Sequence, residues 1–230
     1  IDIDELHSKI DYKSMKESNF KESLLNKDEA IIAEIKKASP SAGIISEDFD
    51  PVSKAKEYES FGAAALSILT EEDYFLGSIS YLVNVKKVSD LPILRKDFII
   101  DAYQIYESKL IGADCILLIA AILSDEQLQN FTNIADQLGL DYIIEIHDKD
   151  ELSRVEIFSK AIIGVNNRDL KTFEVDINNS ILLRNEFKQD NVFVSESGIK
   201  SRKDIDMLKE NNINVFLIGE SLMKGDFFAT

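Results

Sequence analysis

The chain has 230 residues, 45% of them hydrophobic, and a single cysteine, so it can bury a sizeable core and has no disulfide of its own. A formal net charge of −16 argues against nucleic acid as a partner, although a few lysines in a cleft can still bind a small anion. The apolar run 115–123 is too short for a membrane span, and the N-terminus lacks the apolar segment of a signal peptide, so we expect a cytoplasmic protein that contacts no membrane.

Residues 1–29 carry spaced aliphatic residues among many charges, which predicts a short N-terminal helical extension. Eight short apolar runs follow without polar alternation, as is typical of strands buried on both faces. The runs are Ala30–Ile35, Ala63–Leu69, Pro92–Leu94, Cys115–Ala120, Tyr142–Ile146, Ala161–Val165, Val192–Val194 and Val215–Ile218. A helix fits between successive runs, and capping signals at Asp50-Pro51 and at Ser124 mark where two of these helices begin.

Eight strand–helix units predict an α/β protein with a (β/α)8 barrel, also called a TIM barrel, in which residues 1–230 form one domain. A doubly wound sheet would suit the same units. Charged, amide or small polar residues close nearly every run, however, and barrel closure brings all of these strand ends to one face. The chain starts with Ile1 and leaves too few residues after position 225 for a full closing helix, so we expect a trimmed chain.

The ends of the first and third runs carry candidate acid–base residues. Glu34 and Lys36 lie two apart on a strand and share a face. An acid beside a base is costly to bury unless it is used, and the alternative is a surface ion pair. Lys96 points into the barrel mouth if Arg95 faces outward. Apolar walls there would disfavour its charged form and make it a general acid, with a solvated lysine as the alternative.

Further polar residues close the fifth and sixth runs. Alternation places both Glu145 and His147 at the mouth, and a surface position is hard to explain for Glu145 between two isoleucines. The chain has only two histidines and no cluster of metal ligands, so we expect no metal and interpret His147 as a wall residue. Asn166 can orient a hydroxyl or a carboxylate, and Arg168 can bind a carboxylate or pair with Asp169.

Small residues at the ends of the last two runs predict a phosphate site. Ser197 and Gly198 follow the seventh run, and Gly219 and Glu220 follow the eighth. Phosphate commonly binds the loops after strands seven and eight of such barrels, where backbone N–H groups approach it. A plain glycine turn would explain either loop alone. Ser39 offers a further hydroxyl, although the Ser-Pro sequence that it begins is also common in ordinary turns.

Several of these segments resemble the indole-3-glycerol phosphate synthase family. The matching segments are Glu34–Ser41, Ser67–Phe75, Pro92–Phe98, Gly164–Leu170, Ser195–Ile199 and Phe216–Met223. They occur in the family's order, from about Phe20 to the end of the chain. The resemblance implies a step of tryptophan biosynthesis that needs no metal and no cofactor. In that step, 1-(2-carboxyphenylamino)-1-deoxyribulose 5-phosphate closes a ring and loses carbon dioxide and then water.

The resemblance also implies catalytic roles at individual positions. Lys96 resembles the general acid that protonates the carbonyl oxygen. Lys36 resembles the lysine that contacts the substrate carboxylate and acts as an acid in dehydration. Glu145 and Glu34 resemble the carboxylates that take protons and orient the lysines, and their division between the steps stays open.

Other positions resemble the family's binding residues. Asn166 and Ser197 match those that hold the carboxylate and hydroxyls, and Glu196 lines the same wall. The remaining candidates are the phosphate cradle and the aromatic pair that packs the anthranilate ring: Ser39, Gly198, Gly219, Phe75 and Phe98. Glu220 departs from members that carry serine beside the phosphate, so its carboxylate must turn away. The N-terminal extension is also shorter than the family's usual cover over the mouth.

Two other functions compete with this one. Phosphoribosylanthranilate isomerase is a phosphosugar barrel that uses a cysteine and an aspartate, but here Cys115 falls inside the fourth run, where we expect a buried thiol. The second is a catalytically silent barrel that binds a phosphorylated ligand or a partner protein. The presence of both lysines, Lys36 and Lys96, and of both glutamates, Glu34 and Glu145, argues against it. We expect a monomer that acts on a small phosphorylated substrate.

Overall fold

The computed structural model describes residues 3–12, 15–169, 171–225 and 227. Leu170, which closes one of the family segments, lies outside these ranges, as do residues 226 and 228–230, part of the stretch expected to be too short for a full closing helix. The strands are β1 (Ala30–Ile35), β2 (Ala38–Ser39), β3 (Gly43–Ile44), β4 (Ala65–Leu69), β5 (Ile93–Lys96), β6 (Cys115–Ile119), β7 (Asp141–Ile146), β8 (Ile162–Asn166), β9 (Phe193–Glu196) and β10 (Val215–Ile218).

The helices alternate with the strands along the chain. They are α1 (Ile3–Lys9), α2 (Phe20–Leu25), α3 (Pro51–Ser60), α4 (Ile79–Lys86), α5 (Ala102–Leu110), α6 (Asp125–Gln137), α7 (Lys149–Val155), α8 (Asn178–Glu186), α9 (Arg202–Glu210) and α10 (Glu220–Lys224). The capping signals act as expected, since Asp50 accepts from the N–H groups of Val52 and Ser53, and Ser124 forms a capping box with Gln127. None of the described helices is long and apolar enough to cross a membrane.

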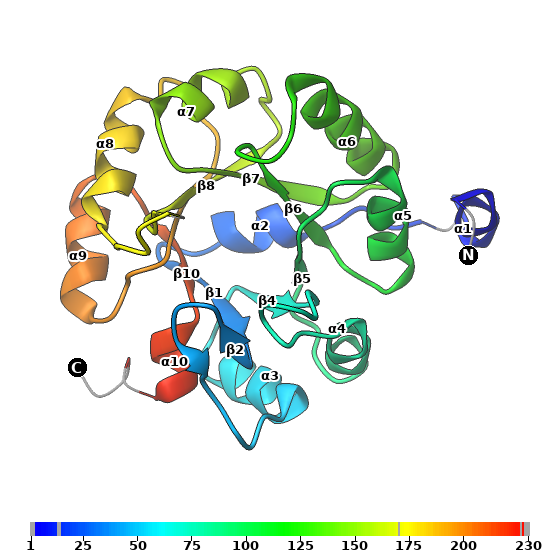
Figure 1. The fold of residues 1–230 in the computed structure, drawn as a ribbon, viewed down its shortest axis with the longest axis horizontal. Helices are drawn as coiled ribbons and strands as arrows, with labels where there is room; N and C mark the ends of the chain where they lie inside the picture. Colours follow the sequence, from blue (N-terminus) through cyan, green and yellow to red (C-terminus); the bar gives the residue numbers. More distant parts are fainter. Residues whose placement is uncertain (1–2, 13–14, 170, 226, 228–230) are drawn as a thin grey trace.

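Eight parallel strands form a closed barrel in the order β1-β10-β9-β8-β7-β6-β5-β4, with helices around the outside (Figure 1). The predicted (β/α)8 barrel is therefore confirmed. The boundaries of the eight apolar runs agree with those of the barrel strands within two residues. Strands β5 and β9 extend beyond their runs, to Lys96 and Glu196. These two side chains therefore belong to the rigid barrel wall and not to loops.

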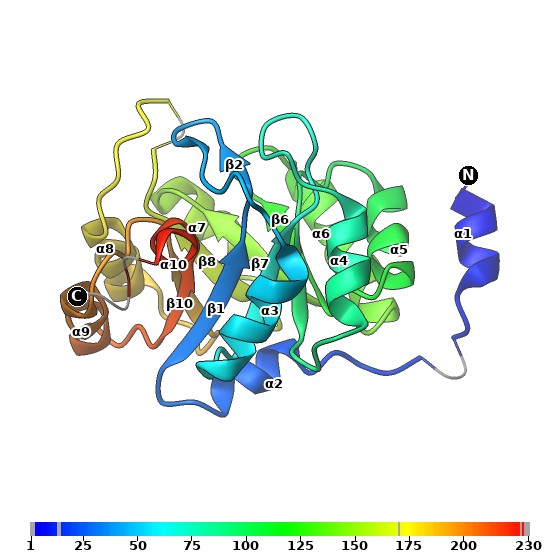
Figure 2. The ribbon, with the colours of Figure 1, turned by 90° about the horizontal axis from the view of Figure 1, so that it is seen from below.

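The apolar side chains pack in two shells. One fills the space between strands and helices, and the other fills the barrel interior, where Cys115 is fully buried as expected. Helix α2 closes the lower end of the barrel with Phe20 and Leu24, which belong to the interior shell (Figure 2). The barrel interior is therefore solid at this end and open only at the other.

The N-terminal extension does not cover the open end of the barrel. Helix α1 packs beside α5 on the outside, where the His7 ring lies 4.0 Å from the ring of Tyr106, and α2 lies under the barrel (Figures 1 and 2). At the open end, the small hairpin β2–β3, which the sequence did not predict, follows β1. The last described helix, α10, has five residues, in keeping with the little chain left after β10.

Candidate active site

A cavity of about 1050 Å³ lies at the carboxyl ends of the barrel strands. Every residue assigned to the site from the sequence lines it: Glu34, Lys36, Ser39, Phe75, Lys96, Phe98, Glu145, Asn166, Arg168, Glu196, Ser197, Gly198, Gly219 and Glu220. Barrel closure brings them together because parallel strands end at the same face. Their grouping is thus observed, and their individual roles stay predictions.

The floor of the cavity holds one lysine between two buried glutamates. Lys96 Nζ lies 2.5 Å from Glu196 Oε2 and 3.3 Å from Glu145 Oε2. The expectation of apolar walls around Lys96 is wrong. Burial alone would lower the pKa of Lys96, but the negative charges of Glu196, Glu145 and Glu34 outweigh burial and raise it. Lys96 on the floor of the cavity is therefore a charged ammonium, stabilised by the neighbouring carboxylates.

The two glutamates differ in their electrostatic surroundings. Burial raises the pKa of Glu196 to about 7, helped by the charge of Glu145 and opposed by Lys96. Burial acts in the same direction on Glu145, but Lys96, His147 and a hydrogen bond from Asn166 outweigh it and lower the pKa of Glu145. One carboxylate thus stays ionised while the other titrates near neutrality. A pair of acids with separated pKa values is typical of acid–base sites.

A second acid–base pair comes from β1. Lys36 Nζ donates to Glu34 Oε1 at 2.5 Å, and the two side chains are only 16% and 5% exposed. The alternative of a surface ion pair is therefore wrong. Gly219 leaves the space that Glu34 occupies, because a Cβ added there would lie 2.4 Å from Glu34 Oε1. Gly164 does the same for Glu196, whose Oε1 would lie 2.2 Å from an added Cβ.

The loops after β8 and β9 carry the polar wall of the cavity. Asn166 Nδ2 donates to Glu145 Oε1 at 3.2 Å, and Asn166 Oδ1 accepts from the Arg168 N–H. The Arg168 guanidinium donates to Phe173 O, while Asp169 caps the following turn by accepting from the N–H groups of residues 171 and 172. Arg168 therefore does not depend on Asp169 for its position, and its guanidinium lines the cavity.

The next turn holds an uncommon backbone conformation. Ser197 has a φ of 66° and Gly198 a φ of 85°, both in the left-handed region. The buried Asn167 fixes this turn, because its Nδ2 donates to Ser195 Oγ and to Ser197 O, and its Oδ1 accepts from Ser180 N. Sequence reasoning missed Asn167; the Asn166-Asn167 doublet gives no signal to tell the cavity residue from its buried neighbour.

The expected phosphate residues lie around the start of α10 and the β2–β3 hairpin. Ser39 Oγ accepts from Ala42 N and closes the hairpin turn. Glu220 turns to Lys224, whose Nζ lies 2.6 Å from Glu220 Oε1, and this hydrogen bond lowers the pKa of Glu220. Glu220 and Lys224 both line the cavity, so the expectation that this carboxylate turns away from the phosphate stays a prediction. At the mouth, the Phe75 and Phe98 rings form a tilted pair with centroids 6.2 Å apart.

Two other sequence-based placements were tested by the structure. Arg95 faces outward as expected, and it forms a buried network with Asp97, Glu107 and Ser108 that joins β5 to α5. His147 is a correction: it is not among the residues that line the cavity, but lies behind Glu145. Strand β7 ends at Ile146, so the strand alternation that predicted its direction no longer applies.

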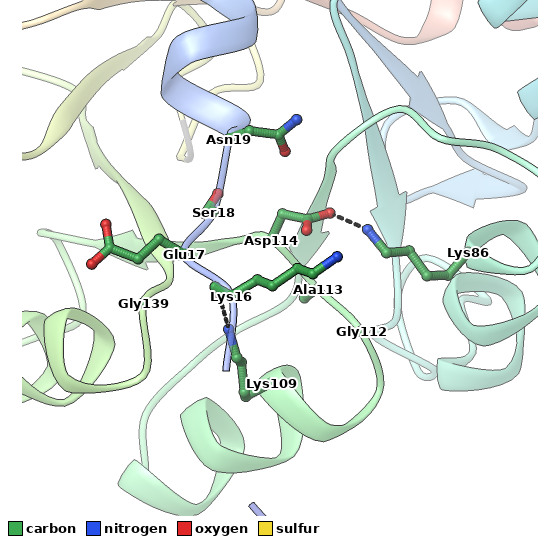
Figure 3. Close-up of a pocket in the computed structure, with 10 residues that line it drawn as sticks. All are labelled: Lys16, Glu17, Ser18, Asn19, Lys86, Lys109, Gly112, Ala113, Asp114 and Gly139. Carbon is green, nitrogen blue, oxygen red and sulfur yellow. Dashed lines mark hydrogen bonds and ion pairs between the residues drawn. The ribbon is translucent and has the colours of Figure 1, made fainter. Parts of the chain in front are cut away.

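A second cavity, of about 500 Å³, lies at the opposite end of the barrel, where residues 16–19 cross the starts of β6 and β7 (Figure 3). Two of its lysines are already engaged. Lys86 Nζ lies 2.6 Å from Asp114 Oδ2, and Lys109 Nζ donates to Lys16 O at 3.0 Å. The first contact joins α4 to the start of β6 and the second attaches the N-terminal extension to α5, so we assign no ligand to this cavity. Among the described residues, no group of three or more His, Cys, Asp or Glu is placed to hold a metal.

Comparison with known proteins identifies the family. The family model described as indole-3-glycerol phosphate synthase matches residues 1–229. The chain belongs to this family. An indole-3-glycerol phosphate synthase from Lachnoclostridium phytofermentans is 54% identical over 193 residues, which cover 84% of this chain and 71% of the relative. One from Endomicrobium trichonymphae is 53% identical over 211 residues, covering 92% and 82%. The resemblance predicted from the sequence is thus confirmed.

Solved structures agree on the fold. The tryptophan synthase α subunit from Pyrococcus furiosus superposes with a TM-score of 0.64 at 15% identity, covering 86% of this chain and 89% of that one. The N-acetylmannosamine-6-phosphate 2-epimerase from Clostridium perfringens reaches a TM-score of 0.66 at 13% identity, covering 88% and 91%. At these identities the likeness concerns the barrel alone. The indole-3-glycerol phosphate synthase assignment rests on the closer relatives.

Proposed function

We propose that this chain converts 1-(2-carboxyphenylamino)-1-deoxyribulose 5-phosphate to indole-3-glycerol phosphate, as a lyase of tryptophan biosynthesis. Membership in the indole-3-glycerol phosphate synthase family supports the reaction. The observation that carries the mechanism is the placement of Lys96 between Glu145 and Glu196, with the Lys36–Glu34 pair lining the same cavity. The reaction needs groups that donate protons to the substrate and groups that accept protons from it. The lysines and glutamates of the cavity supply both.

Ring closure begins when the aromatic carbon that bears the carboxylate attacks the substrate ketone. The Lys96 ammonium donates its proton to the ketone oxygen, which becomes a hydroxyl. Carbon dioxide then leaves, and the electrons of the broken bond restore the aromatic ring. General acid catalysis of this kind contributes about 10²- to 10⁴-fold. The surrounding carboxylates keep Lys96 protonated before each turnover.

Dehydration completes the indole. Lys36 protonates the hydroxyl, which leaves as water, and a carboxylate takes a proton from the adjacent carbon of the new ring. Glu34 and Glu145 both reach the cavity and either can serve as this base. Lys36 thus supplies the acid, and the base comes either from the same strand, as Glu34, or from β7, as Glu145.

Substrate recognition uses the rim of the cavity. The substrate carries a carboxylate and a phosphate, and the cations that line the cavity besides Lys36 and Lys96 are Arg168, Lys200 and Lys224. The tilted Phe75 and Phe98 rings offer an apolar contact for the anthranilate ring. We also propose that the chain acts as a monomer and, because its substrate is a phosphorylated metabolite, that it works in the cytoplasm.

A fluorescence assay with the carboxyphenylamino substrate tests this function, because the chain has no tryptophan and the indole product emits above its background. We expect turnover by the wild-type protein and a loss of roughly 10²- to 10⁴-fold in Lys96→Met. The exposed Lys87→Met is the matched control and should turn over normally. Wild-type protein that binds the product without turnover would replace this proposal with a silent barrel, and activity retained in Lys96→Met would remove Lys96 from its role.

A further inference from the structure

Glu145 is held from two sides by cations and donors. On the cavity side, Lys96 Nζ lies 3.3 Å from Glu145 Oε2. At the other carboxylate oxygen, which also accepts from Asn166, His147 Nε2 lies 3.5 Å from Glu145 Oε1, longer than a hydrogen bond but within ion-pair range. The His147 side chain is 14% exposed and does not line the cavity. It therefore reaches the reaction only through Glu145.

Glu151 fixes the orientation of the His147 ring. Glu151 Oε2 accepts from the His147 backbone N–H at 2.7 Å and lies 3.2 Å from its Nδ1. A carboxylate on Nδ1 places a proton on that nitrogen and turns Nε2 toward Glu145. The backbone is held as well, since Asn179 Nδ2 donates to His147 O at 2.9 Å. The ring therefore has little freedom to leave Glu145.

The protonation of Nε2 decides whether this contact attracts or repels. Nε2 is buried and has no hydrogen-bond partner among the described residues. With a bare lone pair it would face the lone pairs of Glu145, whereas with a proton it would give a charge-assisted contact. The charged groups around the ring are Glu145 on β7, Glu151 on α7 and Glu196 on β9, and α8 contributes the neutral Asn179.

These groups favour the protonated ring. Burial lowers the pKa of His147, but Glu151, Glu145 and Glu196 outweigh it, so its pKa lies above the ordinary value. A cation on each side of Glu145 keeps that carboxylate ionised and in place beside Lys96.

We propose that His147, oriented by Glu151, is a positioning residue that holds Glu145 ionised and aligned with Lys96 through a protonated Nε2. The inference rests on the proposed function for its consequence in turnover. It goes beyond that function because His147 and Glu151 contact Glu145 and not the substrate. A single proton on His147, outside the cavity, thus keeps the Glu145 carboxylate inside the cavity ionised and in place.

The first test measures the proton directly. The chain has two histidines, so His7→Gln leaves a single imidazole whose nitrogen and carbon resonances report His147 through a pH titration. We expect His147 to titrate above the ordinary histidine value of about 6.5. In a Glu151→Gln variant, which keeps the acceptor for the His147 backbone N–H, the midpoint should move to lower pH. A ring that stays neutral from about pH 5 to 8 would overturn the proposal.

The second test measures turnover in the same variants. His147→Gln should lower kcat by roughly 10- to 100-fold, as misplacement of a reacting group does, with KM little changed. Glu151→Gln should lose activity near neutral pH and recover it as the pH falls and the ring is protonated. A purely structural role would give no such recovery. His7→Gln is the control and should keep wild-type kcat and KM, since His7 packs on Tyr106 outside the barrel.

The two tests separate the proposals. No turnover by the wild-type protein would contradict the proposed function, and the titration would still decide the state of His147. Wild-type turnover together with an unchanged pH profile in Glu151→Gln would overturn the role of His147 alone.

Discussion

The two carboxylate oxygens of Glu196 have different surroundings. Its Oε2 pairs with Lys96, while its Oε1 is buried without a hydrogen-bond partner among the described residues. An unpaired buried oxygen favours the protonated acid, in agreement with a pKa raised by burial to about 7. Near neutral pH this side chain can therefore hold a proton beside the one that Lys96 carries. Near neutral pH the floor of the cavity can therefore carry two protons, one on the Lys96 ammonium and one on the Glu196 carboxyl.

The raised pKa of Glu196 predicts a pH dependence of stability. The unfolded carboxyl ionises near its ordinary value of 4.5, and the folded one near 7, so protonation favours the folded state. This contribution is fully present below the unfolded value and is lost as the pH rises through 7. Relative to Glu196→Gln, the wild-type free energy of unfolding should fall between about pH 5 and pH 8 by at most about 3 kcal/mol. Urea titrations of both proteins at the two pH values measure it, and a constant difference would contradict the assignment.

Gly219 predicts a coupling with Glu34. Gly219 does not adopt the left-handed conformation, and a side chain at this position lacks space, because an added Cβ would lie 2.4 Å from Glu34 Oε1. Gly219→Ala should cost about 1–3 kcal/mol of unfolding free energy by overpacking and should displace Glu34. In a Glu34→Ala background, most of that cost should disappear, because the nearest contacts of the added Cβ are with the Glu34 carboxylate. Equal costs in the two backgrounds, from a double-mutant cycle in urea, would show that Glu34 is not the obstacle.

At the scale of elements, α2 acts as the floor of the barrel. Phe20 and Leu24 are buried against the interior shell, whereas Leu25 on the same helix is 65% exposed. Phe20→Ala should lower the free energy of unfolding by about 3–5 kcal/mol. Leu25→Ala should change it by less than about 0.5 kcal/mol. Both variants should keep wild-type KM, because α2 lies at the end of the barrel away from the cavity; similar losses in the two variants would show that α2 does not close the core.

The strands were predictable because a strand buried on both faces has a plain sequence signature, as β1 and β10 show by matching their runs residue for residue. The cavity residues were predictable because they follow from where those strands end. The surroundings of Lys96 were not, since Glu145 and Glu196 come from distant strands and meet it only after closure. The predicted direction of the His147 side chain was wrong for another reason. His147 lies one residue past β7, where strand alternation stops and the contacts with Glu151 set the direction of the ring.

At the scale of the whole molecule, the net charge of −16 opposes compaction. Surface carboxylates repel one another over distances that salt screens, with a Debye length of about 30 Å at 0.01 M and about 8 Å at 0.15 M. The free energy of unfolding should therefore rise as sodium chloride is raised over this range. Urea titrations at the two salt concentrations measure the change, with sucrose at matched osmolality as the control. A decrease would mean that local ion pairs such as Arg202–Glu29 outweigh the general repulsion.

The pairing of β1 with β10 closes the barrel and places Glu34 against Gly219. During synthesis, β1 leaves the ribosome before every other strand of the barrel, yet its partner β10 is the last of these strands to be made. A nascent chain carries Lys36, Lys96 and Glu145 long before it carries β10, the strand that completes the barrel. We therefore expect activity only after β10 docks, because a chain that ends before β10 holds Lys36, Lys96 and Glu145 without the strand that completes the barrel around them.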